Sequence, residues 1–240
     1  FGVTKGFKSG GFNLLASGPP TQYEPEEILA YEAGVRSTLH DGRVILNASV
    51  FHYDYTDLQL RTLVFTGTGG GAFATTNNAE GAKIDGVEVS TDVKLGGGFR
   101  FDLAAAYLDA TFDTYISPSN NLNLSGTKLP LSPEWSGTAG LTFTSDLAGG
   151  DLRARVEYVY RDEIIFPLTI DAPQNFDDSA GLVNATVRWT APGGRYYVEA
   201  VGRNLTDELY RTQRADVFFS GVYDSFGAPR TGEIRLGVAF

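Results

Sequence analysis

The stretch "DLRARVEYVY", residues 151–160, alternates strictly between two kinds of side chain. One phase is apolar or aromatic: Leu152, Ala154, Val156, Tyr158 and Tyr160. The other phase carries the charges of Arg153, Arg155 and Glu157. The upstream stretch "EWSGTAGLTFTS", residues 134–145, repeats the period of two. This period predicts β-strands with one apolar and one polar face.

Alternating stretches recur along the whole chain, so we expect about ten strands and no helix. They lie near residues 1–8, 28–38, 43–61, 79–95, 99–112, 133–145, 151–162, 179–190, 195–206 and 229–240. Several exceed the usual strand length of soluble proteins, about 5 to 6 residues, and reach the roughly 9 to 11 that a tilted strand needs to cross a bilayer. Strand length therefore favours a membrane barrel.

The connections between these strands alternate in length. Tight turns rich in glycine are expected at residues 39–42, 96–98, 146–150 and 191–194. Loops of 16 to 22 residues are expected at 9–27, 62–78, 113–132, 163–178 and 207–228. Loops of this length are uncommon in compact soluble domains, and short turns at one end with long loops at the other are typical of outer-membrane barrels.

Composition excludes several other classes of protein. The 240 residues include no cysteine, which removes disulfides and thiolate metal sites. The formal charge of −10 argues against nucleic acid as a partner. We therefore predict an all-β chain, an antiparallel transmembrane β-barrel with periplasmic turns and extracellular loops. The alternative is a soluble β-sandwich or solenoid with one wet face.

A barrel fixes which way each phase points. The apolar phase should face lipid and the charged phase the lumen, so Arg153, Arg155, Glu157, Glu199 and Arg203 are expected inside. There they could bind a plug or a ligand, or form structural charge ladders between strands.

One segment departs from this pattern. In "RVILNASVFHYDYTDLQL", Phe51, Tyr53 and Tyr55 take the phase opposite to Val44 and Val50. We expect a bulge there, or the strand leaving the membrane, with the aromatic residues at the interface or on the lumen wall.

Several pieces together resemble the C-terminal portion of the TonB-dependent outer-membrane receptors. They are "KGFKSGGFN", "EPEEILAYEAGVRSTLHDGRVILNASVFHYDYTDLQL", "NNAEGAKIDGVEVS", "GTKLPLSPEWSGTAGLTF", "VEAVGRNLTDELYR" and "GAPRTGEIRLGVAF". The resemblance runs along essentially all of the chain, and the order of the pieces carries it.

The resemblance implies a barrel of about 22 strands closed by an N-terminal plug, for uptake of scarce ligands such as ferric siderophores. Energy would be relayed by the TonB complex of the inner membrane. Residues 1–240 would then form the C-terminal part of the barrel, without plug or N-terminal strands. Implied partners are outer-membrane lipid and lipopolysaccharide, the protein's own plug domain, and the barrel assembly machinery. No cofactor and no enzymatic activity are expected.

Ligand capture would fall to the long loops. Candidate ligand contacts are Phe65, Tyr115, Phe166, Asp171, Phe218 and Tyr223. Loop 163–178 is acidic and without a basic residue, which suits either a divalent-cation surface or, as we favour, solvated charge. His40 and His52 lie on different parts of the predicted barrel, so we expect no metal site. Asn204 and Asp207 should organise the backbone of a turn.

The final residue, Phe240, shares the lipid-facing phase of "EIRLGVAF", residues 233–240. Many outer-membrane barrels end on an aromatic residue that the assembly machinery recognises, and we expect Phe240 to serve as that signal. The alternative is one more interfacial aromatic residue. Two other function classes stay open at this point, a passive porin-like or adhesin-like barrel and a soluble carbohydrate-binding sheet.

Overall fold

The computed structural model describes residues 1–13, 20–65, 72–117, 121–166, 175–217 and 221–238, with side chains described except at 63–65, 72–73 and 215–217. Sixteen strands are present in this part of the chain, and no helix. Correspondingly, none of the described residues form a helix that could span a membrane.

Ten strands form one antiparallel sheet in the order β1-β4-β5-β6-β7-β8-β9-β12-β13-β16. Their bounds are β1 (Gly2–Lys8), β4 (Glu26–Leu39), β5 (Val44–Phe65), β6 (Ala72–Gly96), β7 (Phe99–Thr114), β8 (Trp135–Leu147), β9 (Gly150–Arg161), β12 (Ala180–Thr190), β13 (Tyr196–Arg203) and β16 (Thr231–Val238). Each strand of this sheet pairs with the next one along the chain, so the sheet is a meander, as predicted. Within the described residues β1 and β16 each have a single neighbour, and the sheet is open.

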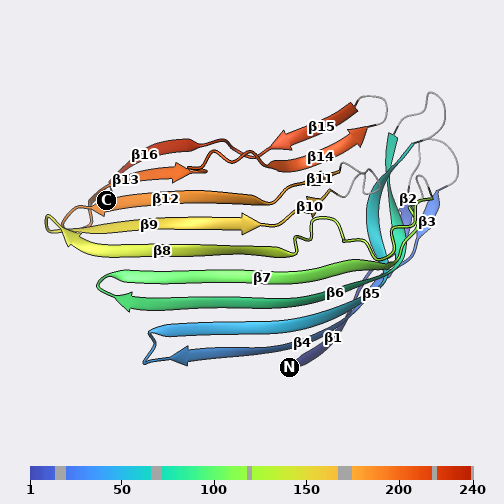
Figure 1. Cartoon of the computed structure of the whole chain (residues 1–240), viewed down its shortest axis with the longest axis horizontal. Coiled ribbons are helices and arrows are strands. Elements are labelled where there is room, and N and C mark those ends of the chain that lie inside the picture. The colour runs from blue at the N-terminus through green and yellow to red at the C-terminus, as the bar shows by residue number, and fades with distance from the viewer. Residues whose placement is uncertain (14–19, 66–71, 118–120, 167–174, 218–220, 239–240) are drawn as a thin grey trace.

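Three small hairpins stand outside the main sheet. They are β2 (Gly11–Asn13) with β3 (Thr21–Tyr23), β10 (Ile164–Ile165) with β11 (Phe176–Asp177), and β14 (Arg211–Val217) with β15 (Gly221–Phe226). Figure 1 shows the tight turns of the main sheet at one end of the strands and these hairpins at the other. The predicted asymmetry between a turn end and a loop end is confirmed.

The tight turns have the backbone geometry that their sequences predict. Gly97 and Gly98 have φ of 60° and 84°, and Ala148 and Gly149 have φ of 53° and 77°. Two successive residues with positive φ match the right-handed twist of the paired strands, which explains the glycines. These turns set the register of the hairpins β6–β7 and β8–β9.

The predicted loop 62–78 is wrong over most of its length, because β5 and β6 stay paired as far as Phe65 and Ala72. Among the side chains described in this extension, the buried ones are polar: Thr62 accepts a hydrogen bond from Asn77 at 2.8 Å, and Thr75 lies beside it. The sequences at 62–65 and 72–78 do not alternate between apolar and polar residues, so the period-two signal disappears although backbone pairing continues. Hairpins also occupy parts of the predicted loops 9–27, 163–178 and 207–228.

The predicted bulge at Phe51–Tyr55 is also wrong. Phe51 pairs with Glu32 and Gly86, and the register stays constant on both sides of β5 through Tyr55. The irregular residue is Asp57, which has a φ of 55°.

Register then divides the sheet into two faces. The polar face contains Arg155, Asp102, Glu199 and also Phe51 and Tyr53, while Val50, Val87, Tyr107, Val156 and Val187 are among the residues of the apolar face.

Candidate functional site

Arg155 is the centre of a charge network on the polar face. Its guanidinium donates to Asp102 Oδ2 at 2.8 Å and to Glu157 Oε2 at 2.9 Å. Asp102 lies on β7 and Arg155 on β9, so the side chain crosses β8 over Gly140. A Cβ at Gly140 would lie 2.3 Å from the guanidinium, so the glycine leaves the space that the bridge occupies and a larger residue would make Arg155 move. The network ties three strands together.

A second group of charges lies near the edge of the sheet that is formed by β13 and β16. Arg235 on β16 donates to Glu199 on β13 at 3.2 Å and to Glu233 at 2.8 Å. The guanidinium of Arg188 stacks 3.7 Å from the ring centre of Tyr197. The structure places all five residues predicted for the lumen, Arg153, Arg155, Glu157, Glu199 and Arg203, on this polar face.

The polar face is hollowed between β1 and β9. A trough of about 1150 Å³ is lined largely by small side chains such as Ser49, Ser90, Ala104 and Thr138. A hollow that extends over this many adjacent strands requires the sheet to curve around it, which identifies the polar face as the concave one. Such a surface can receive another body of protein or a passing solute.

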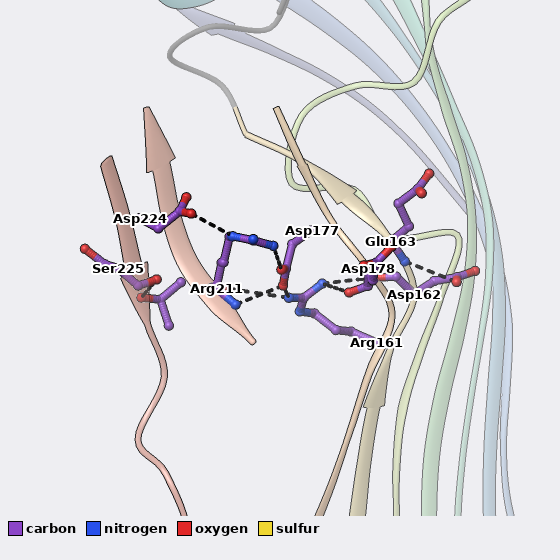
Figure 2. A network of polar contacts seen from close by, with 9 residues as sticks. Arg161, Asp162, Glu163, Asp177, Asp178, Arg211, Asp224 and Ser225 are labelled. Atoms are coloured by element: carbon purple, nitrogen blue, oxygen red, sulfur yellow. Dashed lines mark hydrogen bonds and ion pairs between the residues drawn. The ribbon is translucent and has the colours of Figure 1, made fainter. Parts of the chain in front are cut away.

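At the loop end, a chain of charges joins two hairpins (Figure 2). The Asp177 side chain is 5% exposed and forms ion pairs with Arg161 and, at 3.1 Å, with Arg211. The backbone N–H of Arg211 donates to the same carboxylate at 3.0 Å. Arg211 Nε also contacts Asp224 at 3.1 Å, and Arg214 lies 3.5 Å from that carboxylate.

The arginines and aspartates of this loop-end charge network stabilise one another's charged forms. The hydrogen bond to Asp224 raises the pKa of the Arg211 guanidinium, partial burial opposes the shift, and Asp177 adds to it. Asp177 belongs to the acidic loop for which we favoured solvated charge, and for this residue that interpretation is wrong because its carboxylate is buried between two arginines. In the described part of the chain no cluster of ligating side chains could hold a metal ion.

Sequence reasoning missed Arg161, Arg211 and Asp224. They come from β9, β14 and β15, and no local spacing in the sequence connects them. A buried carboxylate next to two arginines becomes visible only once the hairpins are placed.

Two of the predicted ligand contacts lie inside the loops. Tyr115 is 2% exposed and stacks on Phe112 with ring centres 4.9 Å apart, in a cluster with Leu124 and Leu129. Phe166 is also 2% exposed. The structure gives both side chains a packing role, and direct ligand contact stays a prediction for them.

The remaining predicted contacts are placed as follows. Tyr223 on β15 is 57% exposed. Phe65 ends β5, with its side chain outside the described atoms, and Asp171, Phe218 and Phe240 lie outside the described residues.

Asn204 closes the turn after β13, as predicted. Its side chain accepts from the N–H of Glu208 at 2.8 Å and donates to the carbonyls of Glu208 and Ala228, while Asp207 accepts from the N–H of Arg230. His52, by contrast, lies on β5 between Asp85 and Asp54, at 2.8 and 3.1 Å, and apart from His40 in its turn.

A comparison with protein families identifies the family of this protein. Residues 1–206 match the family model described as "TonB dependent receptor-like, beta-barrel". The chain belongs to this family. The resemblance that the sequence motifs indicated is thereby confirmed.

Solved structures of this receptor fold agree in architecture. The ferric yersiniabactin uptake receptor FyuA from Yersinia pestis superposes with a TM-score of 0.78 at 21% identity, over 99% of this chain and 34% of FyuA. BauA, the ferric preacinetobactin receptor from Acinetobacter baumannii, superposes with a TM-score of 0.66 at 18% identity, over 98% of this chain and 33% of BauA. The copper transporter OprC superposes with a TM-score of 0.66 at 17% identity, over 90% of this chain and 32% of OprC. The chain spans about a third of the length of these proteins.

Proposed function

We propose that this chain forms part of the barrel wall and the ligand-capture loops of an outer-membrane receptor for TonB-dependent uptake of a ferric siderophore. The receptor would belong to a Gram-negative bacterium. Its partners would be a plug domain in the lumen, the TonB complex, the barrel assembly machinery, and the surrounding lipid and lipopolysaccharide.

The observation that carries the proposal is the division of one sheet into two faces of opposite chemistry. The convex face exposes apolar side chains such as Val50, Val87, Val156 and Val187, each between 41% and 51% exposed. A soluble sheet would leave this band in water, whereas a bilayer buries it. The concave face carries the charges and the trough, as expected for a lumen.

Aromatic pairs bound the apolar band at both ends. Phe99 and Phe143 meet at 4.7 Å next to the turns, and Tyr107 and Trp135 meet at 4.9 Å towards the loops. Eight residues of β7 separate the two levels, which is about 26 Å along the strand and about 20 Å along the membrane normal at a tilt of about 40°. This span is close to the apolar band of outer-membrane barrels, about 25 Å.

The choice of ligand class rests on the loop surface and on the similar structures. Four large apolar side chains of the loop-end hairpins and their connections are 39% to 74% exposed: Phe176, Leu209, Tyr223 and Phe226. Such a surface suits the aromatic and heterocyclic groups of many iron chelates. FyuA is a receptor for ferric yersiniabactin and BauA a receptor for ferric preacinetobactin, whereas OprC is a copper transporter, so a copper ligand is the second candidate.

Uptake by intact, iron-limited cells tests the proposal. Deleting the gene that encodes the receptor should abolish accumulation of radiolabelled iron from one siderophore in a panel, and expressing the full-length gene should restore it. Copper accumulation measured in the same strains is the control for the second candidate. Unchanged iron uptake from every siderophore, with reduced copper uptake, would replace the ferric ligand with copper.

A further inference from the structure

Two arginines lie directly opposite one another on the concave face. Arg153 on β9 pairs in register with Arg188 on β12. Like charges opposite each other in a sheet destabilise it. Among the described residues no carboxylate forms an ion pair with either guanidinium. On its other side Arg188 is in register with Glu199, but that carboxylate accepts a hydrogen bond from Arg235, and the Arg188 guanidinium stacks on the Tyr197 ring.

Three other arginines of the same face are neutralised within the wall, although Arg36 and Arg203 form no ion pair among the described residues. Arg100 is paired with Asp92, Arg155 with Asp102 and Glu157, and Arg235 with Glu199 and Glu233. The wall therefore supplies carboxylates to these three arginines, whereas Arg153 and Arg188 face each other in register without an ion-paired carboxylate.

The pair borders a hollow that opens to the concave side. This hollow has a volume of about 570 Å³, and Thr144, Thr190, Asp146 and Asp151 also line it. The two aspartates lie at the turn end of β8 and β9, and neither makes a recorded ion pair with the arginines. Space is thus available beside both guanidinium groups for a further anionic group.

We propose that Arg153 and Arg188 dock carboxylate side chains of the protein domain that fills the barrel. This inference rests on the proposed function, because it requires a plug in the lumen. A guanidinium binds a carboxylate through two parallel hydrogen bonds, and two adjacent guanidinium groups can hold one or two acidic side chains. The added negative charge removes the repulsion between the arginines, so docking and wall stability reinforce each other.

Position in the fold favours the plug over the transported ligand. Arg153 is three residues from Gly150, where β9 begins after its turn, and Arg188 is two residues from Thr190, where β12 ends. The hairpins of the loop end lie at the opposite end of these strands (Figure 1). A ligand captured by the loops would therefore bind far from this pair.

Ion conductance of the purified full-length receptor in planar bilayers tests the docking. The double variant Arg153→Glu, Arg188→Glu should increase the conducting fraction at a fixed urea concentration by about tenfold, which corresponds to about 1.4 kcal/mol. The double Arg→Lys variant keeps the charge and should stay close to wild type. Arg100→Gln is the matched control, because it removes an arginine of the same face that is already paired with Asp92. Heat-modifiability on gels verifies that each barrel is folded.

The outcomes separate the inference from the function on which it rests. If wild type is closed and the folded double Glu variant is equally closed, the docking is refuted. If that variant stays closed but loses uptake of an anionic ferric chelate, the arginines contact the ligand and the docking is likewise refuted. If wild type itself conducts freely, the plugged receptor, and with it the proposed function, is overturned.

Discussion

Replacing Asp177 with asparagine should loosen the loop end of this protein without unfolding the sheet. The Asp177 carboxylate receives charge-assisted hydrogen bonds from Arg161 and Arg211 and a further bond from the backbone of Arg211. It thereby ties the hairpin β10–β11 to the hairpin β14–β15 and to the end of β9. Asparagine has nearly the same shape, so the change isolates the charge.

The size of the effect follows from burial. Removing one partner of a fully buried ion pair costs about 3 to 5 kcal/mol. Here the Arg161 and Arg211 side chains are 23% and 28% exposed, and Arg211 keeps Asp224 as a partner, so the cost falls to about 2 to 3 kcal/mol. Because the hairpins can open while the sheet stays paired, the open fraction of the hairpins should rise about 30- to 150-fold.

Hydrogen exchange in detergent-solubilised, full-length receptor measures this opening. Protection of the Arg211 amide and of the amides in β10 and β11 should fall by that factor, while the amides of β7 and β8 keep their protection. Asp178→Asn is the matched control, since Asp178 is exposed and contributes its backbone carbonyl to Arg161. Unchanged protection at Arg211, or an equal loss in the Asp178 variant, would refute the reasoning.

Three further changes test other parts of the structure. Gly140→Ala should push Arg155 out of its bridge and cost about 1 to 2 kcal/mol, measured as a lower temperature of heat-modification; an unchanged temperature would contradict the bridge. Asn204 is 4% exposed, and Asn204→Ala removes three hydrogen bonds of its side chain, so local stability should fall by about 2 kcal/mol. Faster proteolysis within residues 204–230 would show this loss. Phe240→Ala should lower the amount of folded barrel in the outer membrane much more than Trp189→Ala does, and equal amounts would leave Phe240 an ordinary interfacial residue.

The sequence predicts this fold well wherever one face of a strand is apolar and the other polar. Residues 151–160 show the reason, because the register of β9 with β8 and β12 places Arg155 and Val156 on opposite faces. Periodicity gives no signal in the extension of β5 and β6, where apolar and polar residues do not alternate and Asn77 donates a hydrogen bond to Thr62.

The candidate site was less predictable, for a different physical reason. Asp177 is 16 residues from Arg161 and 34 residues from Arg211 along the sequence. The three side chains meet because two hairpins fold back over the loop end. Periodicity reports on local geometry and cannot reveal such contacts. Phe51 and Tyr53 are a milder case, because their aromatic side chains suggested an irregularity and the strand is regular there. Gly86 lies opposite Phe51 and makes room for the ring, since a Cβ at Gly86 would clash with it.

Energy dependence of uptake tests the central claim most directly. Cells that express the full-length receptor should bind a radiolabelled ferric siderophore at their surface whether or not TonB is present, and should accumulate it only when TonB and the proton-motive force are intact. Accumulation that continues at the same rate without TonB would contradict the account and identify the barrel as a passive pore.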